Sequence, residues 1–355
     1  MYRDQTVGVV IPAYNEEGFI GGVLRDIPEY VDRIYVIDDC STDKTWDEII
    51  STAQEVLGSK TAYVEEQINT ANKQIATDGG TLAGRAFVHE PIGCVLPIEH
   101  LSNFGAGGAI KTGYLAALQD KTDVVVTIDG DGQMDLDYLP RLLDPIVNGK
   151  ADYAKANRLL YQEYRQGMSG WRFFGNSILT FLTKIASGYW KMMDPQNGYT
   201  AASHHALDNI GVEGMYEYYG YCNDILVKLN AKGLRLADVA IPGQYGDEES
   251  SIRYPEYIRK VSSMLLRNFL WRLKIRYFVL DFHPLGLFYL FGAITAVSGF
   301  TGMSWSTLGY LLFDQDLFIR MALSTLLFLM GSMFLMFAML FDMQANENRE
   351  LQVYE

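Results

Sequence analysis

The sequence predicts an α/β domain with a mainly parallel sheet, followed by two membrane-spanning helices. In the first 130 residues, short apolar runs typical of strands alternate with longer segments typical of helices. Near the C-terminal end, residues 284–313 and 321–341 contain no Asp, Glu, Lys or Arg. About 20 apolar residues are enough to cross a bilayer as a helix, so both segments qualify. A buried helical hairpin of a soluble protein is the alternative interpretation.

The alternating pattern gives the elements of the domain in chain order. The apolar run "VGVVI" is too short for a buried helix and indicates a strand, and "RIYVIDD" indicates a second one. Ser41 or Thr42 is the expected N-cap of the helix that follows. The expected elements are a strand at 7–11, a helix at 18–26, a strand at 33–39, a helix at 41–57, a helix at 103–119 and a strand at 123–128. Residues 64–92 are polar and weakly patterned, which indicates an insertion at the edge of the sheet.

Composition and charge argue against several classes of protein. The 355-residue chain carries a net charge of −14, whereas nucleic-acid-binding domains present a basic face. Its three cysteines, Cys40, Cys94 and Cys222, form no CxxC pair, which argues against a disulfide framework or a zinc site and favours a reducing compartment. The N-terminal segment turns polar after one short apolar run, so we expect no signal peptide.

Charges around the apolar segments predict their orientation. Basic side chains precede the first segment, whereas the link between the two carries Asp314, Asp316 and a single Arg. By the positive-inside rule, residues 1–283 face the cytoplasm of a two-span protein of the cell membrane. The preceding segment, "SIRYPEYIRKVSSMLLRNFLWRLKIRYFVL" (251–280), is amphipathic and basic, which favours a helix in the membrane interface over an ordinary core helix.

Three polar stretches directly follow predicted strands. They are "PAYNEE" (12–17), "DDCSTDKT" (38–45) and "DGDGQMD" (129–135). The carboxyl ends of parallel strands meet at one edge of a sheet, where ligands bind, so we expect these stretches to line one crevice. Asp129 and Asp131 offer two carboxylates to a hard cation such as Mg²⁺ or Mn²⁺, and the glycines beside them admit a large anion. Taken singly, the first stretch also fits a helix start and the third an acidic turn.

A fourth segment, "NFGAGGAIKTG" (103–113), is rich in glycine and opens a helix. Backbone amides at a helix N-terminus suit a phosphate, whereas a tight contact between helix and sheet also requires glycine. The glycine spacing matches neither a Walker A loop nor the GxGxxG fingerprint. The sequence therefore leaves both interpretations open.

The four motifs, in this order, resemble those of family 2 glycosyltransferases, whose catalytic domain has the GT-A nucleotide-diphospho-sugar transferase fold. The resemblance covers roughly residues 6–260. Within the family, the chain most resembles polyprenyl-phosphate glycosyltransferases of the dolichyl-phosphate mannose or glucose synthase type. Gln133 after the acidic pair and "DPQNGYTAAS" (194–203) select that branch, and the C-terminal spans match its membrane-anchored members.

The resemblance implies a layout and a role for individual residues. The implied layout is a catalytic domain at 1–250, amphipathic juxtamembrane helices at 251–281, two transmembrane helices at 282–342 and a cytoplasmic tail at 343–355. The residues implied to contact the donor nucleotide are Pro12, Tyr14, Glu16, Ile37, Asp39 and Gly130. Those implied to hold the metal ion are Asp129, Asp131 and Gln133, and those implied to bind phosphate are Arg158, Arg172 and Arg253.

Two further acidic residues have less defined implied roles. Asp194 either orients the acceptor or holds the fold. Asp224 lies where other branches carry a Glu-Asp pair, and we do not expect it to act as a base. Because a phosphate acceptor is already ionised at neutral pH, no strong general base is needed.

The implied reaction is inverting transfer of a sugar from a nucleotide diphosphate to a polyprenyl (dolichyl) phosphate, with Mg²⁺ or Mn²⁺, for protein glycosylation or cell-surface glycan assembly. A UDP-sugar is the favoured donor and GDP-mannose the other candidate. The implied partners are the nucleotide sugar, the polyprenyl phosphate, membrane lipid and a second copy of the chain in a homo-oligomer, and no nucleic acid. Transfer onto a lipid-linked oligosaccharide or another saccharide is the alternative, and a membrane-anchored binding protein without catalysis is a third.

Overall fold

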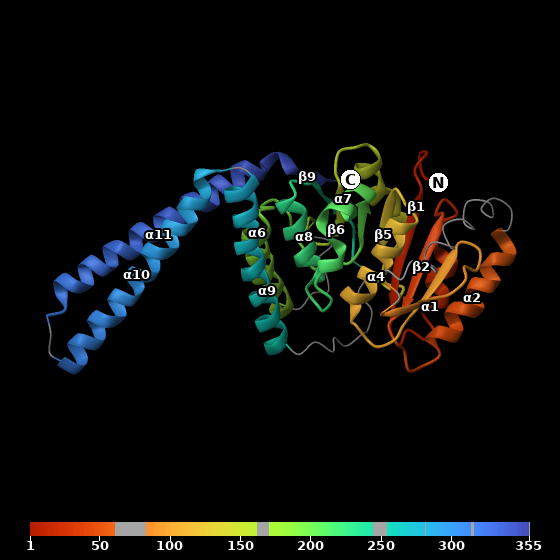
Figure 1. Ribbon diagram of the computed structural model, residues 1–355, viewed down its shortest axis with the longest axis horizontal. Helices are drawn as coiled ribbons and strands as arrows, with labels where there is room; N and C mark the ends of the chain where they lie inside the picture. The colour runs from red at the N-terminus through yellow and green to blue at the C-terminus, as the bar shows by residue number, and fades with distance from the viewer. Residues whose placement is uncertain are drawn as a thin grey trace.

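The computed structural model describes residues 1–60, 82, 84–161, 170–243, 254–280, 282–313 and 316–354. Across these residues, nine strands form one sheet in the order β3-β4-β2-β1-β5-β7-β6-β8-β9 (Figure 1). The strands are β1 (Val7–Ala13), β2 (Arg33–Asp38), β3 (Ala86–Val88), β4 (Val95–His100), β5 (Val124–Thr127), β6 (Tyr153–Asn157), β7 (Thr200–Ser203), β8 (Leu236–Ala240) and β9 (Glu350–Val353). Every neighbouring pair is parallel except those that involve β3 and β7, which confirms the mainly parallel sheet.

Helices pack on both faces of the sheet. The described α-helices are α1 (Ile20–Asp26), α2 (Thr45–Lys60), α4 (Ala106–Gln119), α5 (Leu139–Val147), α6 (Gly170–Ser187), α7 (His204–Ile210), α8 (Tyr221–Ala231), α9 (Tyr254–Lys274), α10 (Pro284–Phe313) and α11 (Phe318–Asn346). The buried side chains of α1, α2 and α5 belong to one core cluster, and those of α4, α7 and α8 to a second. Val9 and Ile11 of β1 lie in the first cluster and Val10 in the second, because successive strand side chains face opposite sides. Burial on both faces explains the uninterrupted apolar runs.

Most predicted elements of the domain are confirmed, with shifted ends. β1 continues through Pro12 to Ala13 instead of ending before the proline. The predicted N-caps of α2 are wrong, because the helix begins at Thr45 and Ser41 and Thr42 bind the 14–16 segment instead. Of the expected edge insertion at 64–92, residues 61–81 and 83 lie outside the described chain, and the described part contains the edge strand β3.

Helices α10 and α11 lie side by side and extend away from the domain as a hairpin (Figure 1). Both are long and apolar enough to cross a bilayer, by length and composition. A Cβ atom on Gly299 would collide with the backbone of Phe328, and one on Gly331 with the backbone of Ala296. Small residues that let two backbones touch are characteristic of helix pairs in membranes.

A buried ionic cluster joins this hairpin to the domain. The guanidinium of Arg272 in α9 lies 2.8 and 3.1 Å from the two carboxylate oxygens of Asp342 in α11, and both side chains are fully buried. The Tyr277 hydroxyl donates to the same carboxylate at 2.6 Å, and Asn230 Oδ1 of α8 accepts from Arg272 at 3.2 Å. Removing one member of a buried pair leaves an uncompensated charge, so this cluster fixes the base of the hairpin against α8 and α9.

Helix α9 has features of both structures that its sequence indicated, a core helix and a helix with an uncovered apolar face. Val261, Met264 and Leu265 are buried, in a cluster that includes side chains of α6 and α8. Leu266 and Leu270 are 61% and 57% exposed. One face of α9 is therefore a core face, and the other leaves apolar side chains uncovered next to the hairpin.

Residues 343–355 do not form the separate tail that the sequence indicated. α11 continues to Asn346, and β9 then pairs in parallel with β8, with Glu350 opposite Leu236 and Val353 opposite Val239. Polar and apolar residues alternate in these four positions, as in a strand, but so short a run is a weak signal by itself, and an edge strand takes much of its order from its neighbour. The chain therefore returns from the hairpin to complete the sheet.

Candidate active site

A crevice of about 140 Å³ lies at the carboxyl ends of β5, β6 and β8. Its lining includes Asp129, Asp131 and Gln133 after β5, Arg158 after β6, and the loop residues Asn197 and Gly198 before β7. Three predicted metal-binding residues and one predicted phosphate-binding residue thus line a single space.

The three polar stretches after β1, β2 and β5 also lie together. A Cβ atom on Gly130 would lie 3.0 Å from the Pro12 carbonyl oxygen and 3.5 Å from Glu16 Cγ, so only glycine leaves this approach unstrained. The Asn15 side chain accepts the Thr42 N–H at 2.8 Å, which ties the first stretch to the second. The topology of the sheet therefore produces the predicted convergence.

The turn at 129–133 presents two carboxylates to the crevice. Asp131 Oδ1 accepts the N–H of Gln133 at 2.9 Å, and Gly132 has a φ of +74°, in the left-handed region that favours glycine. Among the described residues, no group of three or more His, Cys, Asp or Glu side chains is arranged to hold a metal ion. Mg²⁺ and Mn²⁺ are commonly held by one or two carboxylates plus substrate phosphates and water, so this donor set fits such an ion.

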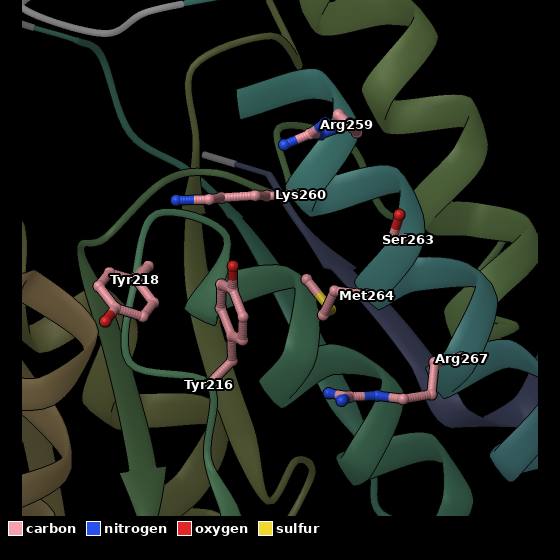
Figure 2. Close-up of a pocket in the computed structure, with 7 residues that line it drawn as sticks. All are labelled: Tyr216, Tyr218, Arg259, Lys260, Ser263, Met264 and Arg267. Carbon is pink, nitrogen blue, oxygen red and sulfur yellow. The ribbon is translucent and has the colours of Figure 1, made fainter. Parts of the chain in front are cut away.

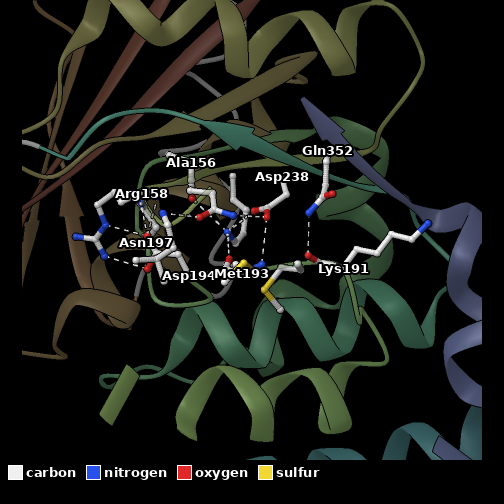
Figure 3. Close-up of polar contacts among 12 residues, drawn as sticks. Ala156, Arg158, Lys191, Met193, Asp194, Asn197, Asp238 and Gln352 are labelled. Atoms are coloured by element: carbon white, nitrogen blue, oxygen red, sulfur yellow. Dashed lines mark hydrogen bonds and ion pairs between the residues drawn. The ribbon is translucent and has the colours of Figure 1, made fainter. Parts of the chain in front are cut away.

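A second wall of the crevice includes Arg158, whose guanidinium is bonded to the buried Asp194 (Figure 3). Arg158 Nε and Nη2 donate to the two carboxylate oxygens at 2.8 and 3.0 Å, and the Arg158 backbone N–H donates at 3.2 Å. Burial raises the pKa of Asp194, but Arg158, with help from Lys155, lowers the pKa further, to below its usual value. Asp194 is therefore ionised and unsuited to act as a base near neutral pH. Of its two predicted roles, the geometry favours holding the structure, because it orients Arg158.

A second buried network lies behind this wall. Lys155 Nζ donates to Asp238 Oδ1 and to the Met193 carbonyl, both at 2.6 Å, and Asp238 Oδ2 accepts the Met193 N–H at 3.1 Å (Figure 3). Lys155 and Asp238 are each 2% exposed. Sequence reasoning missed both residues, because a lone Lys and a lone Asp in two separate strands carry no motif.

Residues 8–83 and 85–211 match the model of Glycosyl transferase family 2. The chain belongs to this family. Its sheet and crevice are those of the GT-A fold. It is 29% identical over 243 residues, which are 68% of this chain and 87% of the relative, to a UDP-N-acetylglucosamine–dolichyl-phosphate N-acetylglucosaminyltransferase of Methanococcus voltae. It is 27% identical over 244 residues, 68% of this chain and 83% of the relative, to an uncharacterised protein of Methanocaldococcus jannaschii.

The glycosyltransferase is also similar in structure to glucosyl-3-phosphoglycerate synthase of Mycobacterium tuberculosis, solved with Mn²⁺, uridine diphosphate and glucosyl-3-phosphoglycerate. The TM-score is 0.49 at 22% identity, over 75% of this chain and 80% of that one.

The residues that the family resemblance implies to contact the nucleoside differ in their exposure. Tyr14 is 47% exposed at the crevice side of β1. Ile37 is fully buried in the core under α4, 3.0 Å from where a Cβ on Gly113 would lie, so its predicted nucleoside contact is not available in this structure. Asp39 is 3% exposed and already accepts hydrogen bonds from the amides of Phe104 (2.9 Å) and Gly105 (2.7 Å) and bonds His100 at 2.6 Å. Asp39 therefore holds the Gly-rich segment, and its contact with a nucleoside stays a prediction.

Asp38 at the end of β2 has a buried acceptor that is unmatched among the described residues, and sequence reasoning assigned this residue no role. Its Oδ1 atom is buried and has no hydrogen-bond partner among the described residues, while Oδ2 accepts the Ser41 N–H at 3.3 Å. Burial raises the pKa of this carboxyl. Asp38 is the register partner of Ala13, which directly precedes Tyr14. The unmatched acceptor beside an exposed tyrosine is the signal that would have identified this residue.

The Gly-rich segment makes close backbone contacts. A Cβ atom on Gly107 would lie 2.7 Å from the carbonyl oxygens of both Tyr216 and Glu217, and the Gly108 N–H donates to the Glu217 carbonyl at 2.9 Å. Gly113 meets Val10 of β1 just as tightly. Of the two open interpretations, the structure shows the tight contact.

A wider groove of about 450 Å³ lies between the 216–218 segment and α9 (Figure 2). Arg259, Lys260 and Arg267 project from α9 into it, toward Tyr216 and Tyr218. Lys260 Nζ lies 5.6 Å from the centroid of the Tyr218 ring. The groove is therefore lined by cations and aromatic rings, on a helix that leads to the hairpin.

Two residues implied to bind phosphate cannot be placed, and Asp224 is not part of the lining of the crevice. The Arg172 backbone lies in α6, but its side chain, like the whole of Arg253, lies outside the described residues. Asp224 is 2% exposed and bonds Asn268 of α9 at 2.6 Å, Lys228 at 2.9 Å and the Tyr216 N–H at 2.9 Å. Asp224 thus holds the wall of the groove, in agreement with the expectation that it is not a base.

Proposed function

We propose that this protein transfers a sugar from a uridine diphosphate donor to the phosphate of a polyprenyl lipid at the cytoplasmic face of a membrane, with inversion at the anomeric carbon. One observation supports the proposal: two carboxylates suited to a divalent ion and an arginine suited to a phosphate line the same crevice. A reaction between two phosphate-bearing substrates needs both kinds of group.

The acidic turn (residues 129–133) would handle the donor. Asp129 and Asp131 would hold Mg²⁺ or Mn²⁺ with the donor diphosphate, and Gln133 lies beside them. When bound, such an ion neutralises charge that develops on the leaving nucleotide. Gly130 and Gly132 keep the turn free of side chains that would obstruct the diphosphate.

Arg158 would bind the acceptor phosphate. Arg158 lines the crevice, and its bonds from Nε and Nη2 to Asp194 fix the orientation of the guanidinium there. Holding the phosphate oxygen in line with the anomeric carbon is a positioning effect, and the ionised phosphate needs no base. The lowered pKa of Asp194 agrees with this role.

A lipid acceptor is supported by the arrangement around the crevice. The hairpin would cross the bilayer, and the uncovered apolar side chains of α9 would lie in its interface. The cationic groove shown in Figure 2 lies along α9, the helix that leads to the hairpin, and would attract an anionic lipid to this part of the domain. The Methanococcus voltae relative is named for transfer from UDP-N-acetylglucosamine to dolichyl phosphate, which supports a uridine nucleotide as the donor.

Asp38 and Tyr14 would recognise the nucleoside. The exposed Tyr14 ring would lie against the base, and the buried Asp38 Oδ1, which has no hydrogen-bond partner among the described residues, would accept a base N–H if the groups that cover it move on binding. An acceptor of this kind suits a base with an imide N–H, which uracil and guanine both present.

A donor panel tests the proposal. The full-length protein in detergent or nanodiscs is incubated with Mn²⁺ or Mg²⁺, a polyprenyl phosphate and UDP-N-acetylglucosamine, UDP-glucose or GDP-mannose, and the lipid product is read by mass. We expect a mild-acid-labile monosaccharide lipid from a UDP-sugar. Label found only in longer glycans would favour a saccharide acceptor, and absence of product with every donor would contradict the proposal.

A further inference from the structure

We propose that Glu350, the first residue of β9, is a positioning residue for transfer, because its carboxylate fixes the segment that presents Asp194 to Arg158. The inference rests on the proposed function and assigns a part in it to the C-terminal strand. Glu350 Oε1 accepts the N–H of Trp190 at 2.7 Å, and Oε2 accepts those of Lys191 at 2.8 Å and Met192 at 2.9 Å. Three consecutive amides are thus bound by one side chain from a strand about 160 residues away in the chain.

The contacts continue without a gap from these amides to Asp194. Gln352 of β9 donates to the Lys191 carbonyl at 3.1 Å (Figure 3). Met193, the next residue along, is held at its N–H by Asp238 and at its carbonyl by Lys155. Asp194 then has a φ of +48°, which is uncommon for a residue other than glycine and persists only where the surroundings enforce it. The hydrogen bonds from β9, β8 and β6 hold the segment next to Asp194 in this conformation.

Charge strengthens these contacts. Protonation turns one carboxyl oxygen into a hydroxyl donor and weakens it as an acceptor, so the ionised form binds three amides better than the neutral form. Burial raises the pKa of Glu350 to about 7, although the three amides and Lys184 of α6 lower it. Around it, Tyr189 also interacts electrostatically with Glu350, and Lys191 pairs with Glu347 at 3.4 Å.

The sign of the pH effect follows from these contacts. Because the folded pKa lies above the ordinary 4.5, the carboxyl contributes stability below pH 4.5 and loses that contribution as the pH rises through about 7. The ionised form, which orders the 190–194 segment, is therefore the less stable one. We expect turnover to fall as the pH is lowered through about 7, in the direction opposite to stability.

The test compares Glu350→Gln with Glu347→Gln in the full-length protein. The control removes a carboxylate three residues earlier, whose ion pair with Lys191 is exposed. With UDP-N-acetylglucosamine and polyprenyl phosphate, we expect Glu350→Gln to lower kcat about 10-fold or more, as for a misplaced catalytic geometry, with the donor KM little changed. The acidic limb of the pH profile near 7 should disappear in this variant and persist in the control.

Hydrogen exchange of the 190–192 amides gives a readout that needs no substrate. We expect faster exchange in Glu350→Gln than in Glu347→Gln. If the wild type transfers no sugar, the proposed function fails while the exchange rates still decide whether Glu350 orders the segment. Wild-type kcat, pH profile and exchange in Glu350→Gln would overturn the inference. Should that variant not fold, Gln352→Ala replaces it, with a smaller fall in kcat expected and an unchanged kcat as the contradicting result.

Discussion

The acidic turn and the second wall of the crevice, Arg158 with residues 190–194 (the arginine wall), are held by contacts of different range. Within the acidic turn, Asp131 bonds the Gln133 amide two residues away, and the Asp129 N–H donates to Met134 Sδ at 3.3 Å. The arginine wall depends on Asp194, Lys155, Asp238 and Glu350, which come from four distant segments. One wall of this crevice is thus determined by neighbouring residues in the chain, whereas the other forms only when distant segments have folded together.

The largest effect is expected from Asp131→Ala in the acidic turn. Loss of one of two metal-binding carboxylates should lower kcat/KM by about 10³-fold or more, while the fold stays intact because the carboxylate bonds only its own turn. Turnover with Mn²⁺ and thermal unfolding are the measurements. Asp137→Ala, which removes an exposed carboxylate six residues along, is the control and should retain activity. Full activity in Asp131→Ala would sink the metal assignment.

The next effect is expected from Asp194→Asn in the arginine wall. The neutral amide cannot accept both Arg158 N–H groups, so kcat should fall about 10²-fold as Arg158 loses its orientation. The pKa of Asp194 is lower in the folded protein than its ordinary value of 3.8. Its ionised form therefore stabilises the fold above pH 3.8, and this stabilisation is lost as the pH falls through the folded pKa. Acid unfolding should therefore be shallower in the variant than in the wild type or in the exposed control Asp208→Asn. Equal acid sensitivity of all three proteins would contradict this account.

A change behind the arginine wall should lower stability as well as turnover, because Lys155 also holds the Met193 carbonyl next to Asp194. Lys155→Met leaves Asp238 buried without its cation, so the free energy of unfolding should fall by about 3–5 kcal/mol. Lys150→Met at an exposed position should change it by about 0.5 kcal/mol or less. Denaturant titration of both variants is the measurement. A Lys155→Met protein as stable as wild type would show that the pair is dispensable.

The smallest effect concerns the Gly-rich segment. Gly107→Ala places a methyl group against two carbonyl oxygens and should cost about 1–3 kcal/mol of unfolding free energy. Gly22→Ala in α1, where a Cβ atom meets nothing within 4 Å, should instead stabilise by about 0.5–1 kcal/mol. Thermal melts compare the two, and opposite signs are the expected result.

The sequence predicted the parts of the molecule that are encoded locally. The order of strands and helices, the convergence of three strand ends and the acidic turn all follow from patterns within a few residues of each other. It missed β9, because an edge strand of four residues carries little pattern of its own. It also misplaced Ile37, because burial under α4 depends on a helix from a distant segment. The Lys155–Asp238 pair could not be predicted for the same reason, because the two residues come together only when β6 pairs with β8.

The position of β9 in the chain has a consequence for how the protein is made. A ribosome synthesises both long helices before it releases Glu350, so a nascent chain that has not yet delivered its hairpin lacks the strand that holds the arginine wall. On the proposed role of Glu350, such a chain can fold its acidic turn while its second wall is incomplete. On the proposed function, in which the hairpin crosses a bilayer and the acceptor is a lipid, the order of synthesis would couple completion of the arginine wall to insertion of the hairpin.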